Sequence, residues 1–456
     1  MLPSKFKNFL KLFLANILVF LAVAIVIEVG GQIYAYFHPA YKVIPFAPHP
    51  VMGWRFIPNS DHIVTGDYWY AREFSAEVKI NSHGFRDLER SVEKDKNTVR
   101  IALLGNSMIS ARQVEFEKTA GQLLEKRLNK EFGGKTGKKY EVLSFGVDGY
   151  GVGQMLLNWD TYASKFTPDF VFLYVFERNY LRTVSSTWCQ RGFFGIDNLR
   201  QGDSKCLLIR PSIILRTKPV NNYDYVLYIR QQGFNSRSRS LDFKFIEPKT
   251  LEEIKKSFEL KKHQKILHYI KRLPFRKTLP SDYNRFIVEQ EKYLEKEMDG
   301  KRMIRKRETV LGSILPTIIY KLKEIRKTQS LENNWKNEAM YSTGDSDSLS
   351  WFANNLVNLK TLQVLGGNIL NSKSDFIIVD SFQFHSDSVP PIQFSSNWLK
   401  NISRYFNFGY IPLYEGLNES REKGNSPRWK YDMHLNEIGN ELFANSMFGY
   451  LETKLN

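Results

Sequence analysis

Four short segments of this sequence hold side chains that together could carry out acyl transfer. They contain a serine, Ser107, a glycine-rich stretch over 146–151, an amide, Asn179, and an Asp-x-His pair formed by Asp432 and His434. Acyl transfer needs a nucleophile, a base, a carboxylate that orients the base, and donors for an oxyanion. The four segments supply every one of these parts.

Each segment alone has a more ordinary interpretation. A Gly-x-Ser at a strand-to-helix turn is more often a helix N-cap, and a glycine-rich loop after a strand is commonly a turn. An Asn there is commonly a cap, and an Asp-x-His pair in a loop is commonly solvated polar surface. The prediction of a catalytic site therefore depends on the order of all four segments and on their position after strands.

Largely apolar runs indicate the strands that would position these side chains. They are typical of strands buried on both faces of a sheet and cover 99–105, 140–146, 168–176, 375–381 and 409–414. Helices are predicted over 116–132, 351–370, 398–406 and 436–451. Strand, helix and strand at this spacing predict a parallel α/β sheet. Ligands bind at the carboxyl ends of such strands, where the four segments fall.

The rest of the soluble chain divides into an entry segment and an insertion. Residues 38–98 are predicted to be β-rich and to pack on the catalytic domain, which is formed by 99–184 and 351–456. Residues 185–350 are predicted to be a basic, mainly helical insertion. Within 251–330 there are 21 Lys and Arg against 11 Asp and Glu. A solvated helical surface explains this charge, and the alternative is a surface for anionic glycan or lipid headgroups.

Residues 1–37 are predicted to be a cytoplasmic tail and a transmembrane anchor. The stretch 12–27 is apolar apart from Asn16 and, with its apolar flanks, approaches the ~20 residues that span a bilayer. Three lysines precede it, so the positive-inside bias places the N-terminus in the cytoplasm and the catalytic domain outside. A cleaved signal peptide, ending near Ala24, is the alternative. Both alternatives place the remaining residues on the same side of the membrane.

The composition indicates which kinds of partner and cofactor to expect. The formal net charge of +17 over 456 residues favours contact with anionic surfaces. Nucleic acid is not expected for an extracytoplasmic domain. Cys189 and Cys206 are seventeen positions apart, and could be a disulfide or two unrelated thiols. The eight histidines are dispersed, so neither a metal nor another cofactor is expected.

The order of the four segments resembles the SGNH (GDSL-like) hydrolase superfamily, in particular its membrane-anchored bacterial members. The stretches that carry the resemblance are "VRIALLGNSMISARQVEFEKTAGQLLEKRL", "EVLSFGVDGYGVGQ", "PDFVFLYVFERNY" and "YDMHLNEIGN". It covers roughly 45–184 and 351–453 and implies a three-layer, flavodoxin-like parallel sheet. Two residues depart from the usual pattern. Asn106 stands where the family usually has Asp, and Tyr180 stands where Asp is common.

The resemblance implies a role for each candidate site residue. Ser107 would be the nucleophile, His434 the base and Asp432 the residue that orients it. The oxyanion would be held by the backbone N–H groups of Ser107 and Gly149 and by the side chain of Asn179. The expected function is a serine esterase, similar to a carbohydrate O-deacetylase, acting outside the cytoplasm on an acylated cell-envelope polysaccharide or another ester. The alternatives are a polysaccharide O-acetyltransferase with the same triad and a non-catalytic glycan-binding scaffold.

Overall fold

The structure is a computed structural model of the 456-residue chain. It describes residues 4–37, 46–49, 51–68, 71–176, 212–214, 230–231, 234–235, 240–243, 248–260, 262–273, 275–278, 349–381, 396–430, 432 and 434–455. Asn179, Tyr180 and both cysteines lie outside these residues, as does much of the predicted insertion.

A five-stranded parallel sheet forms the centre of the fold. Its strands are β5 (Thr98–Gly105), β6 (Lys139–Gly146), β7 (Phe170–Val175), β13 (Asp375–Asp380) and β14 (Gly409–Ile411). Their order across the sheet is β14-β13-β7-β5-β6, and every neighbouring pair is parallel. This is a doubly wound sheet with the flavodoxin-like order. The predicted fold class, an α/β fold with a parallel sheet completed by C-terminal strands, is confirmed.

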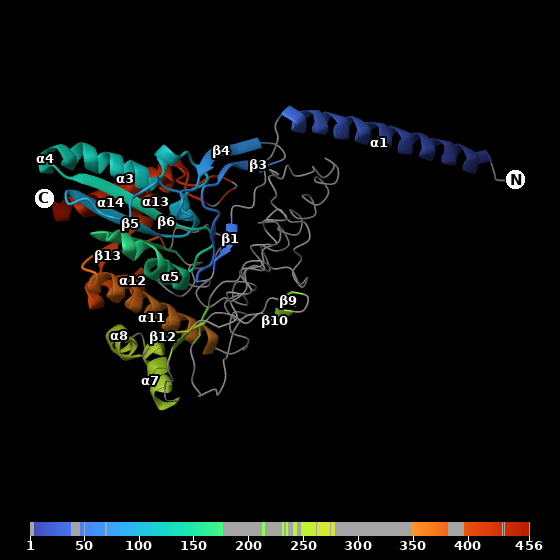
Figure 1. Cartoon of the computed structure of the whole chain (residues 1–456). Helices are drawn as coiled ribbons and strands as arrows, with labels where there is room; N and C mark the ends of the chain where they lie inside the picture. Colours follow the sequence, from blue (N-terminus) through green and yellow to red (C-terminus); the bar gives the residue numbers. More distant parts are fainter. Residues whose placement is uncertain are drawn as a thin grey trace.

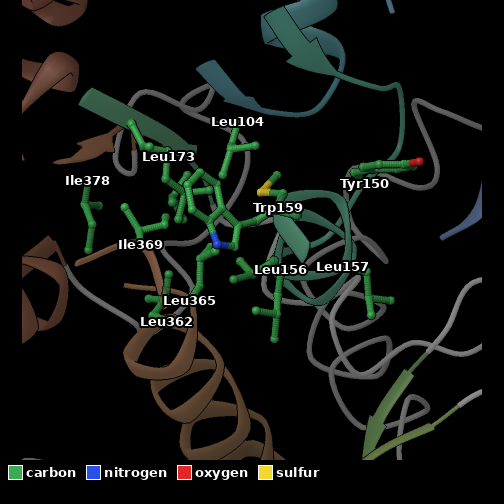
Figure 2. Close-up of a cluster of buried hydrophobic side chains, with 14 of the residues drawn as sticks. Leu104, Tyr150, Leu156, Leu157, Trp159, Leu173, Leu362, Leu365, Ile369 and Ile378 are labelled. Atoms are coloured by element: carbon green, nitrogen blue, oxygen red, sulfur yellow. The ribbon is translucent and has the colours of Figure 1, made fainter. Parts of the chain in front are cut away.

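Alternate residues of each strand enter two separate cores, which makes the fold three-layered. In β5, Ala102 and Leu104 join one core while Ile101 and Leu103 join the other. The first core includes α5 (Val152–Thr161), α11 (Leu349–Asn371) and α12 (Ser396–Phe406). Figure 2 shows Trp159 of α5 among the leucines of α11 and the strands.

The opposite core contains further helices of the sheet domain. Among them are α3 (Ala120–Leu128), α13 (Leu413–Glu422) and α14 (Glu437–Leu455). Helices α3 and α14 pack against each other, and Figure 1 shows both on the face of the sheet away from α11 and α12. Helices therefore cover both faces, as a sheet of strands buried on both sides requires.

Two predicted elements differ from the structure. The helix expected over 116–132 is broken, because Thr119 is extended and caps a helix that begins at Ala120, after a separate turn over Phe116–Lys118. The strand expected over 409–414 ends at Ile411, because Pro412 takes the N-cap position of α13. Helices α5 and α13 were not among the predicted elements.

The entry segment forms two antiparallel pairs. One pair is β1 (Phe46–His49) with β2 (Gly53–Phe56), and the other is β3 (Asp61–Tyr68) with β4 (Ala71–Lys79). Phe46, Trp54 and Phe56 are fully buried in the same core as α5 and α11. These strands therefore contribute to the interior of the sheet domain.

The described parts of 185–350 contain both helices and strands. The helices are α7 (Pro248–Glu259) and α8 (His263–Arg272). Strands β8 (Ser212–Ile214), β11 (Ser240–Phe243) and β12 (Phe275–Thr278) form a small sheet, and β9 (Arg230–Gln231) pairs with β10 (Phe234–Asn235). Buried side chains of α8, among them Ile266 and Ile270, join the core that contains α11. The boundaries given to the insertion and to the other segments stay predictions.

The N-terminal helix α1 (Ser4–Phe37) contains the apolar stretch predicted from the sequence. An 18-residue window within its segment Lys5–Gly31 has a mean hydropathy of 2.8 and is not buried by the rest of the chain. It is long and apolar enough to cross a membrane, and a signal sequence has the same properties.

Side chains cover the outer edge of β6, the strand at one end of the sheet. The backbone N–H groups of Tyr140, Val142 and Ser144 point away from β5. They donate to Asn129 Oδ1 at 2.9 Å, Glu125 Oε2 at 2.7 Å and Asp87 Oδ2 at 3.0 Å. An uncovered edge strand would present these donors to other chains. The three acceptors therefore protect the sheet from edge-to-edge association.

Asp87 makes the stability of this edge depend on pH. Burial raises its pKa to about 7, against the opposing effects of the Arg90 charge and of two backbone N–H donors. A raised carboxyl pKa favours the folded state most when the group is protonated. This contribution is fully present below about pH 4 and is lost as the pH rises through about 7. In the wild type, the free energy of unfolding lost in this way is on the order of a few kcal/mol. We expect Asp87→Asn, which keeps an acceptor for the backbone N–H of Ser144, to abolish this loss.

Thermal unfolding of the full chain in detergent, from about pH 4 to about pH 8, measures this effect. The difference between the wild type and Asp87→Asn should grow with pH across the window. Asp95→Asn, at an exposed position in the same segment, is the matched control. Parallel curves for wild type and Asp87→Asn would show that Asp87 does not titrate in this range.

Candidate active site

The one-turn helix α2 (Ser107–Ser110) begins directly at the carboxyl end of β5. Asn106 caps it, because its Oδ1 accepts from the backbone N–H of Met108 at 2.9 Å. Asn and Asp are equally good N-caps, so Asn106 keeps the hydrogen bond that an Asp would make. Among the described residues, the buried Nδ2 of Asn106 has no partner.

Two glycines allow α2 to lie on the ends of the strands. A Cβ atom on Gly105 would lie 2.2 Å from the side chain of Ile109. A Cβ atom on Gly146, at the end of β6, would lie 2.5 Å from the backbone nitrogen of Ser110. The place of Ser107 above the sheet thus depends on the absence of side chains at both strand ends.

Ser107 and His434 are in direct contact, although 327 positions separate them in the sequence. His434 Nε2 lies 2.7 Å from Ser107 Oγ. Ser107 is 9% exposed, and within the described residues its hydroxyl contacts the imidazole of His434. This is the geometry in which an imidazole accepts the proton of a serine.

Asp432 holds the other side of the imidazole. Its Oδ1 contacts His434 Nδ1 and also accepts from the backbone N–H of His434 at 2.8 Å. Burial alone would raise the pKa of Asp432. The hydrogen bonds and the charge of His434 outweigh burial and hold that pKa below its ordinary value. Asp432 is therefore ionised at neutral pH and orients the imidazole.

A short loop between α13 and α14 carries the Asp-x-His pair. Arg428 and Leu435 form an antiparallel bridge, and the backbone N–H of Trp429 donates to the carbonyl of His434 at 3.2 Å. Strand β4 supports this loop from outside. Glu73 Oε2 accepts from the backbone N–H of Asp432 at 3.2 Å, and the ring of Phe74 lies 5.3 Å from that of Trp429.

Gly149 lies in a tight turn at the carboxyl end of β6. The N–H of Tyr150 donates to the carbonyl of Val147, and Gly149 has φ = 80°. A type II turn needs a positive φ at this position, which glycine adopts without strain. Trp54 of β2 braces the turn, because its Nε1 donates to the carbonyl of Asp148 at 3.0 Å and its own carbonyl accepts from the Tyr150 hydroxyl. Tyr150 is at one end of the cluster in Figure 2.

The structure thus brings together Ser107, Asp432 and His434, and places Gly149 at the neighbouring strand end. Asn179 lies outside the described residues. The roles assigned to all five stay predictions. Within the described residues, no group of three His, Cys, Asp or Glu is arranged to hold a metal ion.

Sequence reasoning missed a buried polar group beside these residues. Asp148 is 2% exposed and accepts from Ser110 Oγ at 2.6 Å and from Arg112 Nε at 3.0 Å. Burial would raise the pKa of Asp148, but Arg112 and Ser110 hold it below its ordinary value. Its position directly after a strand and before Gly149 was a signal in the sequence. Arg112 carried no such signal.

Comparison with known proteins found matches among solved structures only. No protein-family model matches the chain, and no curated protein matches it in sequence. An acetyl xylan esterase is 11% identical with a TM-score of 0.33, and the match covers 77% of this chain and 100% of that one. A member of the lipolytic G-D-S-L family from Veillonella parvula is 10% identical with a TM-score of 0.31, over 78% and 98% of the two chains.

A lipase/acylhydrolase from Enterococcus faecalis is also 10% identical, with a TM-score of 0.32, over 78% of this chain and 97% of that one. One of these three names, the G-D-S-L family, is the class that the sequence blocks resemble.

Proposed function

We propose that this chain is a serine esterase of the SGNH type. The observation that carries the proposal is the contact between Ser107 Oγ and His434 Nε2, with Asp432 on the other side of the imidazole. These side chains come from two segments that are far apart in the sequence, one near the start and one near the end of the sheet domain. Three residues in this relation have the geometry of a catalytic triad.

In the proposed reaction, Ser107 Oγ attacks the carbonyl carbon of an ester. His434 Nε2 accepts the hydroxyl proton as the new C–O bond forms. The tetrahedral intermediate then collapses, the bond to the leaving alcohol breaks, and His434 delivers the proton to that alcohol. Water, activated by His434 in the same way, releases the acid from the acyl-serine. Asp432 stabilises the imidazolium in both steps.

The proposed oxyanion hole uses the backbone N–H groups of Ser107 and Gly149 and the side chain of Asn179. Two described features support it. Ser107 is the first residue of a helix, where backbone N–H groups are not used within the helix. Gly149 has no Cβ and lies at the next strand end. Each donor of this kind is worth about 10²–10³ in turnover.

We further propose that the site faces the outside of the cytoplasm and acts on an acylated envelope polysaccharide. The apolar helix α1 and the lysines Lys5, Lys7 and Lys11 before it support the location. The sequence resemblance to membrane-anchored bacterial SGNH proteins supports the polysaccharide. The basic residues within 251–330 would suit an acidic glycan.

A fluorophosphonate probe applied to the full chain in detergent tests the esterase proposal. We expect the wild type to be labelled and Ser107→Ala to lose all labelling, because the probe reacts with an activated serine. Ser446→Ala, in the middle of α14, is the matched control and should be labelled like the wild type. A folded wild type that takes up no label would exclude the enzyme and favour a glycan-binding scaffold.

The acceptor of the acyl group is tested separately. Acetate release from an acetylated glycan is measured with and without a second, unacetylated glycan. An esterase releases acetate at the same rate in both cases. A transferase moves the acetyl group to the added glycan, so acetate release falls while the acceptor gains acetyl groups.

A further inference from the structure

The buried cluster of Ser110, Asp148 and Arg112 connects the helix that begins with Ser107 to the turn that contains Gly149. Ser110 is the last residue of α2, whose first residue is Ser107. Asp148 directly precedes Gly149 in the turn at the end of β6. One carboxylate therefore contacts the helix that carries the nucleophile and belongs to the turn that carries an oxyanion donor.

The two oxygens of Asp148 have different partners. Oδ1 accepts from Ser110 Oγ at 2.6 Å, while Oδ2 accepts from Arg112 Nε at 3.0 Å and contacts a second guanidinium nitrogen. A carboxylate held at both oxygens cannot rotate without breaking one of these contacts. Its orientation, and that of the attached turn, is thus fixed relative to α2.

Arg112 is itself held by the entry segment. Arg112 is 8% exposed, and its guanidinium carbon lies 5.8 Å from the ring centre of Phe46 and 5.6 Å from that of Phe56. These rings belong to β1 and β2, and Trp54 of β2 donates to the carbonyl of Asp148. The turn is therefore fixed on both sides, by α2 and by the β1–β2 pair.

Stability alone does not require this cluster. Replacing a buried ion pair by apolar groups of similar volume is often neutral or stabilising, because burying two charges costs much of what their attraction returns. An apolar cluster would not fix the relative orientation of α2 and the turn. Hydrogen bonds with defined angles fix how two elements are oriented, and catalysis is sensitive to shifts of about 1 Å.

We propose that Ser110, Asp148 and Arg112 form a clamp that sets the position of the Gly149 N–H relative to Ser107 Oγ. The clamp makes Asp148 a positioning residue for the oxyanion hole, and it rests on the esterase function proposed above. Asp148 acts through the turn and does not itself contact the ester. Helix α2 and the turn keep a fixed relative position because Ser110 of α2 donates to the carboxylate of Asp148, which belongs to the turn.

Three variants test the clamp, with kcat expressed per titrated Ser107. Ser110→Ala removes the 2.6 Å hydrogen bond to Asp148 and a longer contact, at 3.3 Å, with the carbonyl of Ser107. It leaves the ion pair intact, so its fold is preserved. It should lower kcat about tenfold, with KM within about twofold. Asp148→Asn should lower kcat about 10²-fold. The double variant should match Asp148→Asn alone, because both changes act through the same carboxylate.

The Ser110→Ala variant also separates positioning from charge. Asp148 acts electrostatically on His434, and Ser110→Ala keeps that charge in place. Unchanged kcat in Ser110→Ala, together with a reduced kcat in Asp148→Asn, would overturn the clamp. Unchanged kcat in both variants, with only the unfolding temperature lowered, would also overturn it.

Hydrogen exchange of the 146–151 amides gives a readout that does not depend on turnover. The clamp predicts exchange about tenfold faster or more in Ser110→Ala and Asp148→Asn, with the β5 amides unchanged. If the wild type hydrolyses no ester, the proposed function fails, and this exchange still decides whether the cluster fixes the turn. Unchanged exchange in both variants would contradict the clamp whatever the activity.

Discussion

Asp432→Asn should lower kcat for ester hydrolysis by about 10³–10⁴-fold while the protein stays folded. The wild-type carboxylate accepts from His434 Nδ1 and leaves Nε2 free to accept the Ser107 proton. An asparagine can present its NH₂ group to Nδ1. The imidazole would then carry its proton on Nε2, which faces Ser107 and could no longer act as a base.

Turnover of p-nitrophenyl acetate, per mole of folded protein, measures the effect. Asp375→Asn is the matched control, because this exposed carboxylate begins β13 at the amino end of the strand, away from the site. It should retain wild-type turnover. An Asp432→Asn variant within tenfold of the wild type would mean that Asp432 does not orient His434 during catalysis.

The strand pattern made the place of Ser107 predictable. Apolar runs identify strands, parallel strands end at one edge, and polar residues directly after them must meet there. Gly149 was predictable for the same reason, because it follows the end of β6 within a glycine-rich stretch. The Asp-x-His pair follows helix α13 and not a strand, so its contact with Ser107 was expected only from the order of the segments that carry the family resemblance.

The contacts that brace the site were not predictable in this way. Arg112 pairs with Asp148 because the chain after α2 passes beside the turn at the end of β6. Glu73 reaches the Asp432 backbone because the β3–β4 pair lies on the loop before α14. Each contact involves an irregular segment, the turn at the end of β6 or the loop before α14, and no hydrophobic period encodes the path of such a segment.

His62 illustrates the same limit. In the sequence it is one of eight dispersed histidines. In the structure it is buried on β3, and burial, with Arg112 as the next cause, lowers its pKa to about 3. It is therefore neutral at physiological pH. Only the packing of the entry segment against the sheet domain reveals this environment.

Gly146→Ala should reduce activity at least about 10²-fold and destabilise the fold by about 1–3 kcal/mol. Gly146 does not have a positive φ, so an alanine meets no backbone strain there. The destabilisation and the loss of activity therefore come only from steric contact of the new Cβ atom with α2. The new Cβ would lie 2.5 Å from Ser110 N and 2.6 Å from Ile109 Cβ, and a backbone nitrogen cannot rotate away. Helix α2 must shift, and Ser107 shifts with it.

Gly134→Ala is the matched control, because Gly134 is an exposed helical residue and an alanine Cβ there would have no described atom within 4 Å beyond its own helix and chain neighbours. It should keep full activity and gain about 0.4–1 kcal/mol. Thermal unfolding and kcat per titrated Ser107 are measured for both variants. Gly146→Ala with normal activity would show that α2 tolerates displacement from the end of β6. That result would also contradict the clamp, since both depend on a fixed distance between α2 and the turn that holds Gly149.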